Sequence, residues 1–188
     1  MTSEGDQFFF MDGITTLVLR GISGVGKTVL RKLLVKVLEK LGRKVHVISK
    51  DEYRRFLDER EGYHYTPSEE LNTSRWYRRE YKEQANRKDL NYIICDNTHV
   101  RESELAIPCT PTGRVSKIVI IEVGSYNSAT KSQIPFNVIQ RQRRELYDDR
   151  NALFIACMRG ASLINLTPYE ADEKTAEEII QDCEMDLI

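Results

Sequence analysis

A glycine-rich segment near the start of the chain constrains the fold more than any other feature. The segment consists of Gly21, Ile22, Ser23, Gly24, Val25, Gly26, Lys27 and Thr28. It fits the pattern G-x-x-x-x-G-K-[ST], which binds phosphate where it joins a strand to a helix. Residues 15–19 before it are apolar and β-branched, and residues 28–41 after it place leucine and valine on one helix face. The order strand, loop, helix therefore predicts a phosphate-binding loop, or P-loop.

The residue types of this loop suit a triphosphate. Glycines let the backbone turn its N–H groups inward, and the helix that follows adds the positive end of its dipole. Lys27 is expected to reach the β- and γ-phosphates, and Thr28 to offer its hydroxyl to Mg²⁺, with Asp51 or Asp96 helping through water. The sequence thus predicts ATP and Mg²⁺ as ligands. The expected nucleotide-binding residues are Gly21, Ser23, Gly24, Val25, Gly26, Lys27 and Thr28.

Strand and helix patterns alternate along the rest of the chain. Further strands are expected at residues 43–49, 92–95, 117–123 and 163–166, and further helices from about residue 51 and at 68–87, 135–147, 152–158 and 171–183. This alternation predicts a three-layer α/β fold with a mostly parallel five-stranded sheet and helices on both faces. We expect a single domain over residues 1–188, with an N-terminal arm at 1–12, a lid-like region at 124–147 and an acidic C-terminal helix at 171–188.

Composition excludes several classes of protein. Hydrophobic residues make up 40% of the 188 residues and charged residues 30%, which is unlike a disordered or a membrane-spanning chain. The net charge of -1 excludes a globally basic nucleic-acid coat. Four scattered cysteines indicate reduced thiols, and neither a secretory signal nor a run of ~20 apolar residues is present. We expect a cytoplasmic protein without membrane contact, in the host cytoplasm if a phage encodes it.

An acidic residue follows the second expected strand, at the edge where ligands of parallel sheets bind. Asp51 is placed there beside the γ-phosphate, where it can take the proton of an attacking hydroxyl. Arg54, one helical turn later, is placed to hold an anionic group of the acceptor. The structural alternative is that Asp51 caps a helix while Arg54 and Arg55 face water.

The third expected strand also ends in an acid. Residues 92–96 read Tyr-Ile-Ile-Cys-Asp, which is typical of the strand that supports Mg²⁺ in P-loop proteins. Asp96 is expected to orient Mg²⁺-bound water or the acceptor, and Asn97 follows it on the loop. His99 is interpreted as a hydrogen-bonding histidine rather than a catalyst. It has no metal-ligand spacing with the other histidines, so no zinc site is predicted.

The order of these segments resembles a known family. The P-loop is followed by Lys50-Asp-Glu-Tyr-Arg54, by Tyr63-His-Tyr-Thr66 and by Ile94-Cys-Asp-Asn-Thr98. Over about residues 15–148 this is similar to the polynucleotide 5′-hydroxyl kinases of phages and bacterial RNA repair, and more widely to zeta-toxin-like and AAA_33-type kinases. The resemblance implies a P-loop kinase fold in which Asp51 is the general base, Arg54 contacts an acceptor phosphate, and Asp96 with Asn97 supports the acceptor.

One region departs from the family pattern. The family has a basic lid helix after the fourth strand, whose arginine contacts the β- and γ-phosphates. The matching residues 124–133 here are short and contain a single cation, Lys131. The following helix carries Arg141, Arg143 and Arg144, so the replacement for the lid arginine is expected to be Lys131, Arg141 or Arg144.

Charge is distributed unevenly along the chain. Cations between residues 75 and 88 are interleaved with Trp76, Tyr77 and Tyr81, which suits either a nucleic-acid surface or a helix with its aromatics in the core. Residues 172–188 hold seven acids and one lysine, 7 − 1 giving −6, so the total of -1 leaves about +5 for the rest. We interpret this acidic segment as a solvated helix face.

These observations predict an ATP-dependent kinase that acts on a hydroxyl of nucleic acid, with the 5′-hydroxyl end as the first candidate. A hydroxymethyl group on a modified pyrimidine, such as 5-hydroxymethyluracil in DNA, is a variant of this hypothesis. A small-molecule or nucleotide kinase is an alternative, since Gly24–Thr28 and Leu41–Val47 also resemble adenylylsulfate kinases. A nucleotide-dependent switch is a third, although a guanine-reading N-K-x-D segment is absent from the sequence.

Overall fold

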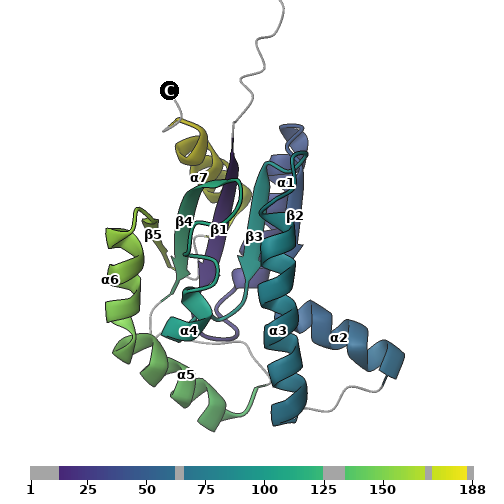
Figure 1. The fold of residues 1–188 in the computed structure, drawn as a ribbon. Coiled ribbons are helices and arrows are strands. Elements are labelled where there is room, and N and C mark those ends of the chain that lie inside the picture. The colour runs from purple at the N-terminus through teal and green to yellow at the C-terminus, as the bar shows by residue number, and fades with distance from the viewer. Residues whose placement is uncertain (1–12, 62–65, 125–133, 168–170, 186–188) are drawn as a thin grey trace, which may run out of the picture.

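The computed structural model describes residues 13–61, 66–124, 134–167 and 171–185. Its centre is a five-stranded sheet with the order β2-β3-β1-β4-β5 (Figure 1). All strand pairings among the described residues are parallel, which confirms the predicted α/β P-loop kinase fold. The strands are β1 (Ile14–Arg20), β2 (Val45–Ile48), β3 (Tyr92–Asp96), β4 (Val115–Val123) and β5 (Ser162–Leu166).

Helices cover both faces of this sheet (Figure 1). One face packs against α1 and α7, and the other against α3, α4 and α6. The helices are α1 (Lys27–Lys40), α2 (Lys50–Glu61), α3 (Pro67–Gln84), α4 (Glu102–Leu105), α5 (Phe136–Asp148), α6 (Arg150–Met158) and α7 (Glu173–Met185). Among the described residues, no helix is both long enough and apolar enough to cross a bilayer.

The central strand β1 is buried along its whole length, as a strand covered on both faces must be. Leu17 and Leu19 contribute to the core beneath α1 and α7, while Val18 contributes to the core beneath α6. This alternation follows from the two-residue period of a strand. It leaves the carboxyl end of β1 in the middle of the molecule, where the phosphate loop begins.

Two glycines of the loop adopt backbone angles that other residues rarely take. Gly21 has φ +143°, and a Cβ atom there would lie 2.6 Å from the carbonyl oxygen of Val123. Gly26 has φ 103° at the N-cap of α1. A side chain at either position is disfavoured, so the glycines of the sequence pattern are required by the turn from β1 into α1.

Strand register gathers the predicted site residues at one edge of the sheet. Leu19 of β1 pairs with Asp96 of β3, and Ile48 of β2 pairs with Cys95. The chain therefore leaves β1, β2 and β3 at nearly the same level. The P-loop, the start of α2 and Asp96 all lie at this edge, as expected for a ligand site in a parallel sheet.

Two features differ from the sequence expectations. The one-turn helix α4 lies in a stretch without a helical pattern. The described part of the acidic C-terminal segment, α7, is not simply a solvated face, since it buries Ala176, Ile179, Ile180 and Cys183. Its acids also pair with cations on and just after α1: Glu173 with Lys36 and Lys40, and Glu184 with Arg43. The arm at 1–12 and most of the lid-like stretch, 125–133, lie outside the described residues.

Candidate active site

Lys27 lies inside the phosphate loop with its ammonium group held by backbone oxygens. Its Nζ donates to the carbonyl oxygens of Gly21 and Ile22 at 2.8 and 2.7 Å. Burial lowers the pKa of Lys27 from 10.5 to about 8, against the opposing charges of Asp96 and Asp51. Among the described residues, no carboxylate forms an ion pair with the Lys27 ammonium, so a bound phosphate can neutralise its charge.

The structure brings Thr28 and Asp96 together at the carboxyl edge of the sheet. The Thr28 hydroxyl lies 3.4 Å from Oδ2 of Asp96, which is buried at the end of β3. Burial raises the pKa of Asp96, and the positive charges of Arg31 and Lys27 oppose that rise. Hydroxyl and carboxylate oxygens are ligands that Mg²⁺ prefers. The pair therefore fits a Mg²⁺ ion that keeps part of its water shell.

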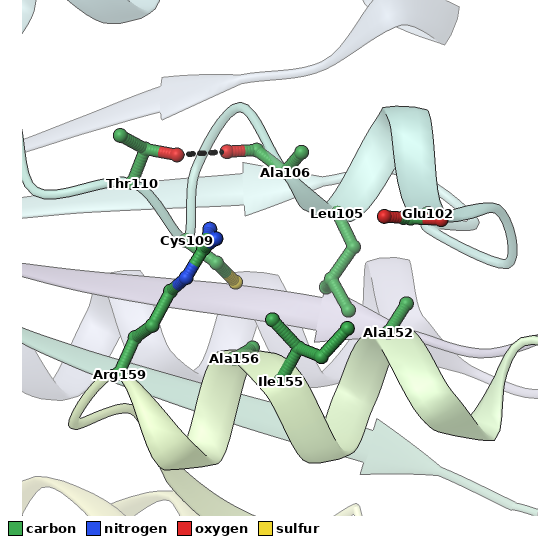
Figure 2. Close-up of a pocket in the computed structure, with 9 residues that line it drawn as sticks. All are labelled: Glu102, Leu105, Ala106, Cys109, Thr110, Ala152, Ile155, Ala156 and Arg159. Atoms are coloured by element: carbon green, nitrogen blue, oxygen red, sulfur yellow. Dashed lines mark hydrogen bonds between the residues drawn. The ribbon is translucent and has the colours of Figure 1, made fainter.

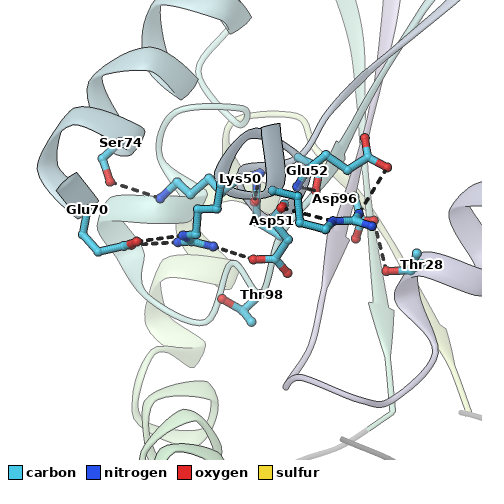
Figure 3. Close-up of polar contacts among 12 residues, drawn as sticks. Thr28, Lys50, Asp51, Glu52, Glu70, Ser74, Asp96 and Thr98 are labelled. Atoms are coloured by element: carbon cyan, nitrogen blue, oxygen red, sulfur yellow. Dashed lines mark hydrogen bonds and ion pairs between the residues drawn. The ribbon is translucent and has the colours of Figure 1, made fainter. Parts of the chain in front are cut away.

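Asp51 occupies the first turn of α2, and its carboxylate is exposed on the side of the site (Figure 3). Its side chain is 83% accessible, and the guanidinium of Arg54 donates to its Oδ1. Asp51 is also close enough to Lys27 and Asp96 for its charge to raise the pKa of both. The structure thus places an accessible carboxylate beside the phosphate loop.

Arg54 is engaged by two carboxylates. Its Nε and Nη2 donate to the two carboxylate oxygens of Glu70, both at 2.7 Å, while Nη1 donates to Asp51. Glu70 and Asp51 are labelled in Figure 3. This bidentate pair ties α2 to α3. Arg54 therefore orients Asp51, and its contact with an acceptor phosphate stays a prediction.

Asn97 connects the end of β3 to the start of α2. Its Oδ1 accepts a hydrogen bond from the backbone N–H of Lys50 at 2.9 Å. The Lys50 ammonium lies 3.3 Å from the Ser74 hydroxyl and 5.4 Å from the centre of the Tyr77 ring. Asn97 thereby acts on α2 rather than on the phosphate loop, which agrees with a supporting role on the acceptor side.

His99 is a structural residue. It is 1% exposed, with a left-handed backbone (φ 46°). Its Nδ1–H donates to the carbonyl oxygen of Leu19 at 2.7 Å, and its Nε2 accepts from the Tyr77 hydroxyl at 3.0 Å. Burial lowers the pKa of His99 to about 3, so the ring is neutral. The interpretation as a hydrogen-bonding histidine agrees with these contacts.

Gln142 of α5 contacts the phosphate loop, although the sequence singled out its arginine neighbours. Its Oε1 accepts from the backbone N–H of Ser23 at 2.9 Å. Arg141 instead faces Glu145 at 3.8 Å, and Arg144 is exposed. Lys131 lies outside the described residues. Helix α5 was expected, but its rotation about its axis, which selects Gln142, has no signal in the sequence.

Arg31 is a second site residue for which no role was predicted from the sequence. It lies one turn after Thr28 on α1, is 7% exposed, and contacts both Asp96 and Glu52 of α2. The sequence does contain a signal for Arg31. It is a charged residue beside the apolar positions of the helix, one turn after the phosphate loop.

The aromatic residues of α3 do not form the stacking surface considered from the sequence. Tyr77 and Tyr81 are each 1% exposed and belong to the core under α3. Trp76 is partly buried, and its ring stacks on that of Tyr53 with centroids 4.0 Å apart. The alternative of a helix with its aromatics in the core therefore holds for both tyrosines.

A separate hollow lies between α4 and α6 (Figure 2). It has a volume of about 30 Å³, which suits one or two water molecules but not a nucleotide. Its lining includes Leu105, Cys109 and Ala156 and none of the residues of the phosphate loop. This hollow is not part of the candidate active site.

A family model for the AAA_33 group, described as an AAA domain, matches residues 17–120. The chain belongs to the AAA_33 family. The matched range runs from β1 into β4 and contains the P-loop, Asp51 and Asp96, the residues that meet at the sheet edge. No curated protein matches the chain.

Solved structures share the fold along nearly the whole chain. A gluconokinase from Sinorhizobium meliloti 1021 is 15% identical over 92% of this chain and 95% of its own, with a TM-score of 0.53. The Mycobacterium tuberculosis APS kinase CysC, in complex with AMPPNP and APS, is 15% identical over 92% and 98%, also at 0.53. Shikimate kinase from Acinetobacter baumannii, in complex with shikimate, is 15% identical over 93% and 96%, at 0.50. This AAA_33 chain therefore has the fold of P-loop kinases.

Proposed function

We propose that this protein is an ATP-dependent kinase that transfers the γ-phosphate to a hydroxyl group of a nucleic acid, with a polynucleotide 5′-hydroxyl as the first candidate. The observation that carries the proposal is the accessible carboxylate of Asp51 at the edge that also holds Lys27 and the Thr28–Asp96 pair. A carboxylate beside a phosphate loop is what a kinase needs to accept the proton of an attacking hydroxyl.

The reaction follows from these positions. Asp51 accepts the proton of the acceptor hydroxyl, whose oxygen forms a bond to the γ-phosphorus while the bond from that phosphorus to the β–γ bridging oxygen breaks and ADP leaves. Arg54 holds Asp51 by its Oδ1, and Lys27 is placed to stabilise charge on the phosphates. Thr28 and Asp96 would hold Mg²⁺, which supplies further neutralisation of negative charge.

Positive charge on the acceptor side supports an anionic acceptor. Burial lowers the pKa of Lys50, and the nearby charges of Arg54 and Arg101 lower it further, against Glu104. A bound anion stabilises the charged form of such a lysine, and a phosphodiester next to the reacting hydroxyl is one such anion. The Asp-Glu-Tyr-Arg segment and Asp96-Asn97-Thr98 add the likeness to polynucleotide kinases described above.

A small-molecule kinase is the second candidate, because the solved structures with this fold include gluconokinase, shikimate kinase and APS kinase. A hydroxymethylated pyrimidine in DNA remains the variant within the first proposal. The two candidates differ in the product that carries the transferred phosphate, and a labelling experiment separates them.

The test is transfer of ³²P from γ-labelled ATP with Mg²⁺. The acceptors are a 5′-hydroxyl oligonucleotide, the same oligonucleotide with a 5′-phosphate, duplex DNA containing 5-hydroxymethyluracil, mononucleosides, and gluconate, shikimate and adenylylsulfate. We expect label on the 5′-hydroxyl oligonucleotide and none on its 5′-phosphorylated control, with loss of labelling in Lys27→Ala. Label only on a small molecule would replace the first proposal by the second.

A further inference from the structure

We infer that Arg31 is a positioning residue that joins the phosphate-loop helix to α2 and so directs Asp51 toward the transferred phosphate. This inference rests on the proposed function, since it assigns Asp51 the proton. The observation behind this inference is a buried guanidinium on α1 between two carboxylates, Glu52 on α2 and Asp96 on β3. Figure 3 labels both of these acidic residues.

The contact with α2 is short and close to the reacting group. Nη1 of Arg31 donates to Oε1 of Glu52 at 2.5 Å, and Glu52 is the neighbour of Asp51 in the first turn of the helix. Successive helical residues point about 100° apart around the axis. A fixed direction for Glu52 therefore also fixes the direction of Asp51.

The contacts of α2 with α3 do not replace this one. Arg54 binds Glu70, and Tyr53 stacks on Trp76, so both of these contacts hold the helix toward α3. The Arg31–Glu52 pair holds it toward α1, the helix that begins with Lys27. A helix held toward both neighbours has less freedom to roll about its axis, and a shift of about 1 Å at a reacting group costs roughly 100-fold in rate.

The second contact of Arg31 acts on the metal side. Its Nε lies 3.5 Å from Oδ2 of Asp96, the same oxygen that faces the Thr28 hydroxyl. The guanidinium thus holds the carboxylate beside Thr28 and offsets the burial that disfavours its charged form. Arg31 has two separable effects, one on the direction of Asp51 and one on the affinity for Mg²⁺.

The experiment compares Arg31→Gln, Glu52→Gln, the double variant and Arg55→Gln. Arg55 is the matched control. It is exposed, and its Nη2 lies 3.9 Å from the same Glu52 oxygen. We measure kcat, KM for each substrate, and the Mg²⁺ concentration at half-saturation, read both from turnover and from the fluorescence of a bound N-methylanthraniloyl ATP analogue.

We expect Glu52→Gln and Arg31→Gln to lower kcat by a similar factor, roughly 10-fold to 100-fold, with KM for ATP within about threefold of wild type. The double variant is expected to be no slower than Arg31→Gln, because the two residues act through one contact. Arg31→Gln alone should raise the Mg²⁺ half-saturation, and Arg55→Gln should match wild type. Arg31→Lys, which keeps the charge but not the two-armed shape, should recover Mg²⁺ affinity but not kcat.

Two outcomes would overturn the inference. One is a folded Glu52→Gln protein with the kcat of wild type, and the other is rate losses that multiply in the double variant. Glu52 is 43% exposed at its side chain, so this variant is expected to fold. The fluorescence readout needs no acceptor. If wild type transfers phosphate to no acceptor, the proposed function fails by itself, and an unchanged Mg²⁺ half-saturation in Arg31→Gln then separately refutes the contact with Asp96.

Discussion

Lys27 and His99 are both buried near the site, and their hydrogen-bond partners hold them in different protonation states. Lys27 faces carbonyl oxygens, which accept hydrogen bonds from a charged ammonium, and it keeps its proton at neutral pH. His99 faces one carbonyl and one hydroxyl, which a neutral ring satisfies completely. The charged Lys27 can therefore bind an anionic ligand, whereas the neutral His99 links β1 to α3 through its two hydrogen bonds.

The lowered pKa of Lys27 makes nucleotide binding depend on protons. In the free protein Lys27 is half protonated near pH 8, and the negative charge of a bound triphosphate favours the charged form. We expect ATP binding to take up about half a proton at pH 8 and close to none at pH 6.5. Calorimetric titrations in two buffers of different ionisation enthalpy measure this uptake. A proton uptake that does not change between these pH values would contradict the assignment.

The neutral state of His99 makes the fold sensitive to acid. Its pKa is about 3 in the folded protein and about 6.5 in an unfolded chain. Between these values only the unfolded state binds the proton, so the free energy of unfolding falls by about 1.4 kcal/mol for each unit by which the pH drops below 6.5. Above that pH the contribution of His99 is complete. The free energy of unfolding, measured with urea at pH 7, 6 and 5, should change less with pH in His99→Asn than in wild type. An equal change with pH in both proteins would exclude this role.

Asp51 can be tested apart from nucleotide binding. Asp51→Asn keeps the shape of the side chain but removes the proton acceptor, so transfer should fall by roughly 100-fold to 10,000-fold. The dissociation constant for ATP should stay within about threefold of wild type. Asp58→Asn is the matched control, because Asp58 lies two turns further along the same face of α2 and is exposed. Full activity of Asp51→Asn in a label-transfer assay would remove Asp51 as the base.

At the scale of elements, the sequence predicts what periodicity determines. Strand β3 and helix α1 were expected nearly within their observed bounds, since β3 is a continuous apolar run and the leucines of α1 follow a helical spacing. The glycines and lysine of the P-loop follow a fixed pattern within one short segment, so the sequence also predicts where a nucleotide site would lie. Helix α4 is only one turn long, too short to produce a period.

The contacts that depend on how a helix is rotated against its neighbours were not predictable in the same way. Arg31, Glu52 and Gln142 act through the rotation and packing of α1, α2 and α5, which depend on the whole assembled sheet. The burial of Tyr77 and Tyr81 was not predictable either, because a sequence with aromatics between cations is the same whether the aromatics face the core or a ligand. The sequence predicted the site residues that lie in the P-loop or follow a strand, such as Asp51 and Asp96, because the parallel topology brings them to one edge.

The Gln142 side chain of α5 accepts a hydrogen bond from the phosphate loop, and this bond can be removed by a single substitution. Gln142→Leu removes the acceptor of the Ser23 N–H, so the free energy of unfolding of the nucleotide-free protein should fall by about 1 kcal/mol. Gln140→Leu makes the same chemical change two residues earlier on α5 and should have a smaller effect. Thermal and urea unfolding measure the difference, and equal losses in both variants would show that the Ser23 contact is not stabilising.

Over the whole molecule, the ion pairs of α7 lie away from the phosphate loop. Glu173 of α7 pairs with Lys36 and Lys40, which lie 9 and 13 residues after Lys27 on α1. At 1.5 Å per residue this is roughly 14 to 20 Å along the helix from the phosphate loop. The net charge of -1 therefore includes acids of α7 that lie far from the phosphate loop, while cations and carboxylates are interleaved beside the site.

The cations beside the site determine how salt should affect binding of a nucleic-acid acceptor. Cations near the start of α2 include Lys50, Arg54 and Arg101. Arg54 already faces two carboxylates and Arg101 faces Glu145. With two or three phosphates neutralised, the slope of log K against log salt concentration should be about −1.4 to −2.1 for a single strand. Fluorescence anisotropy of a labelled 5′-hydroxyl oligonucleotide between 50 and roughly 300 mM salt measures this slope. Lys50→Met should make it shallower by about 0.7, while an affinity independent of salt would favour a small neutral acceptor over a polynucleotide.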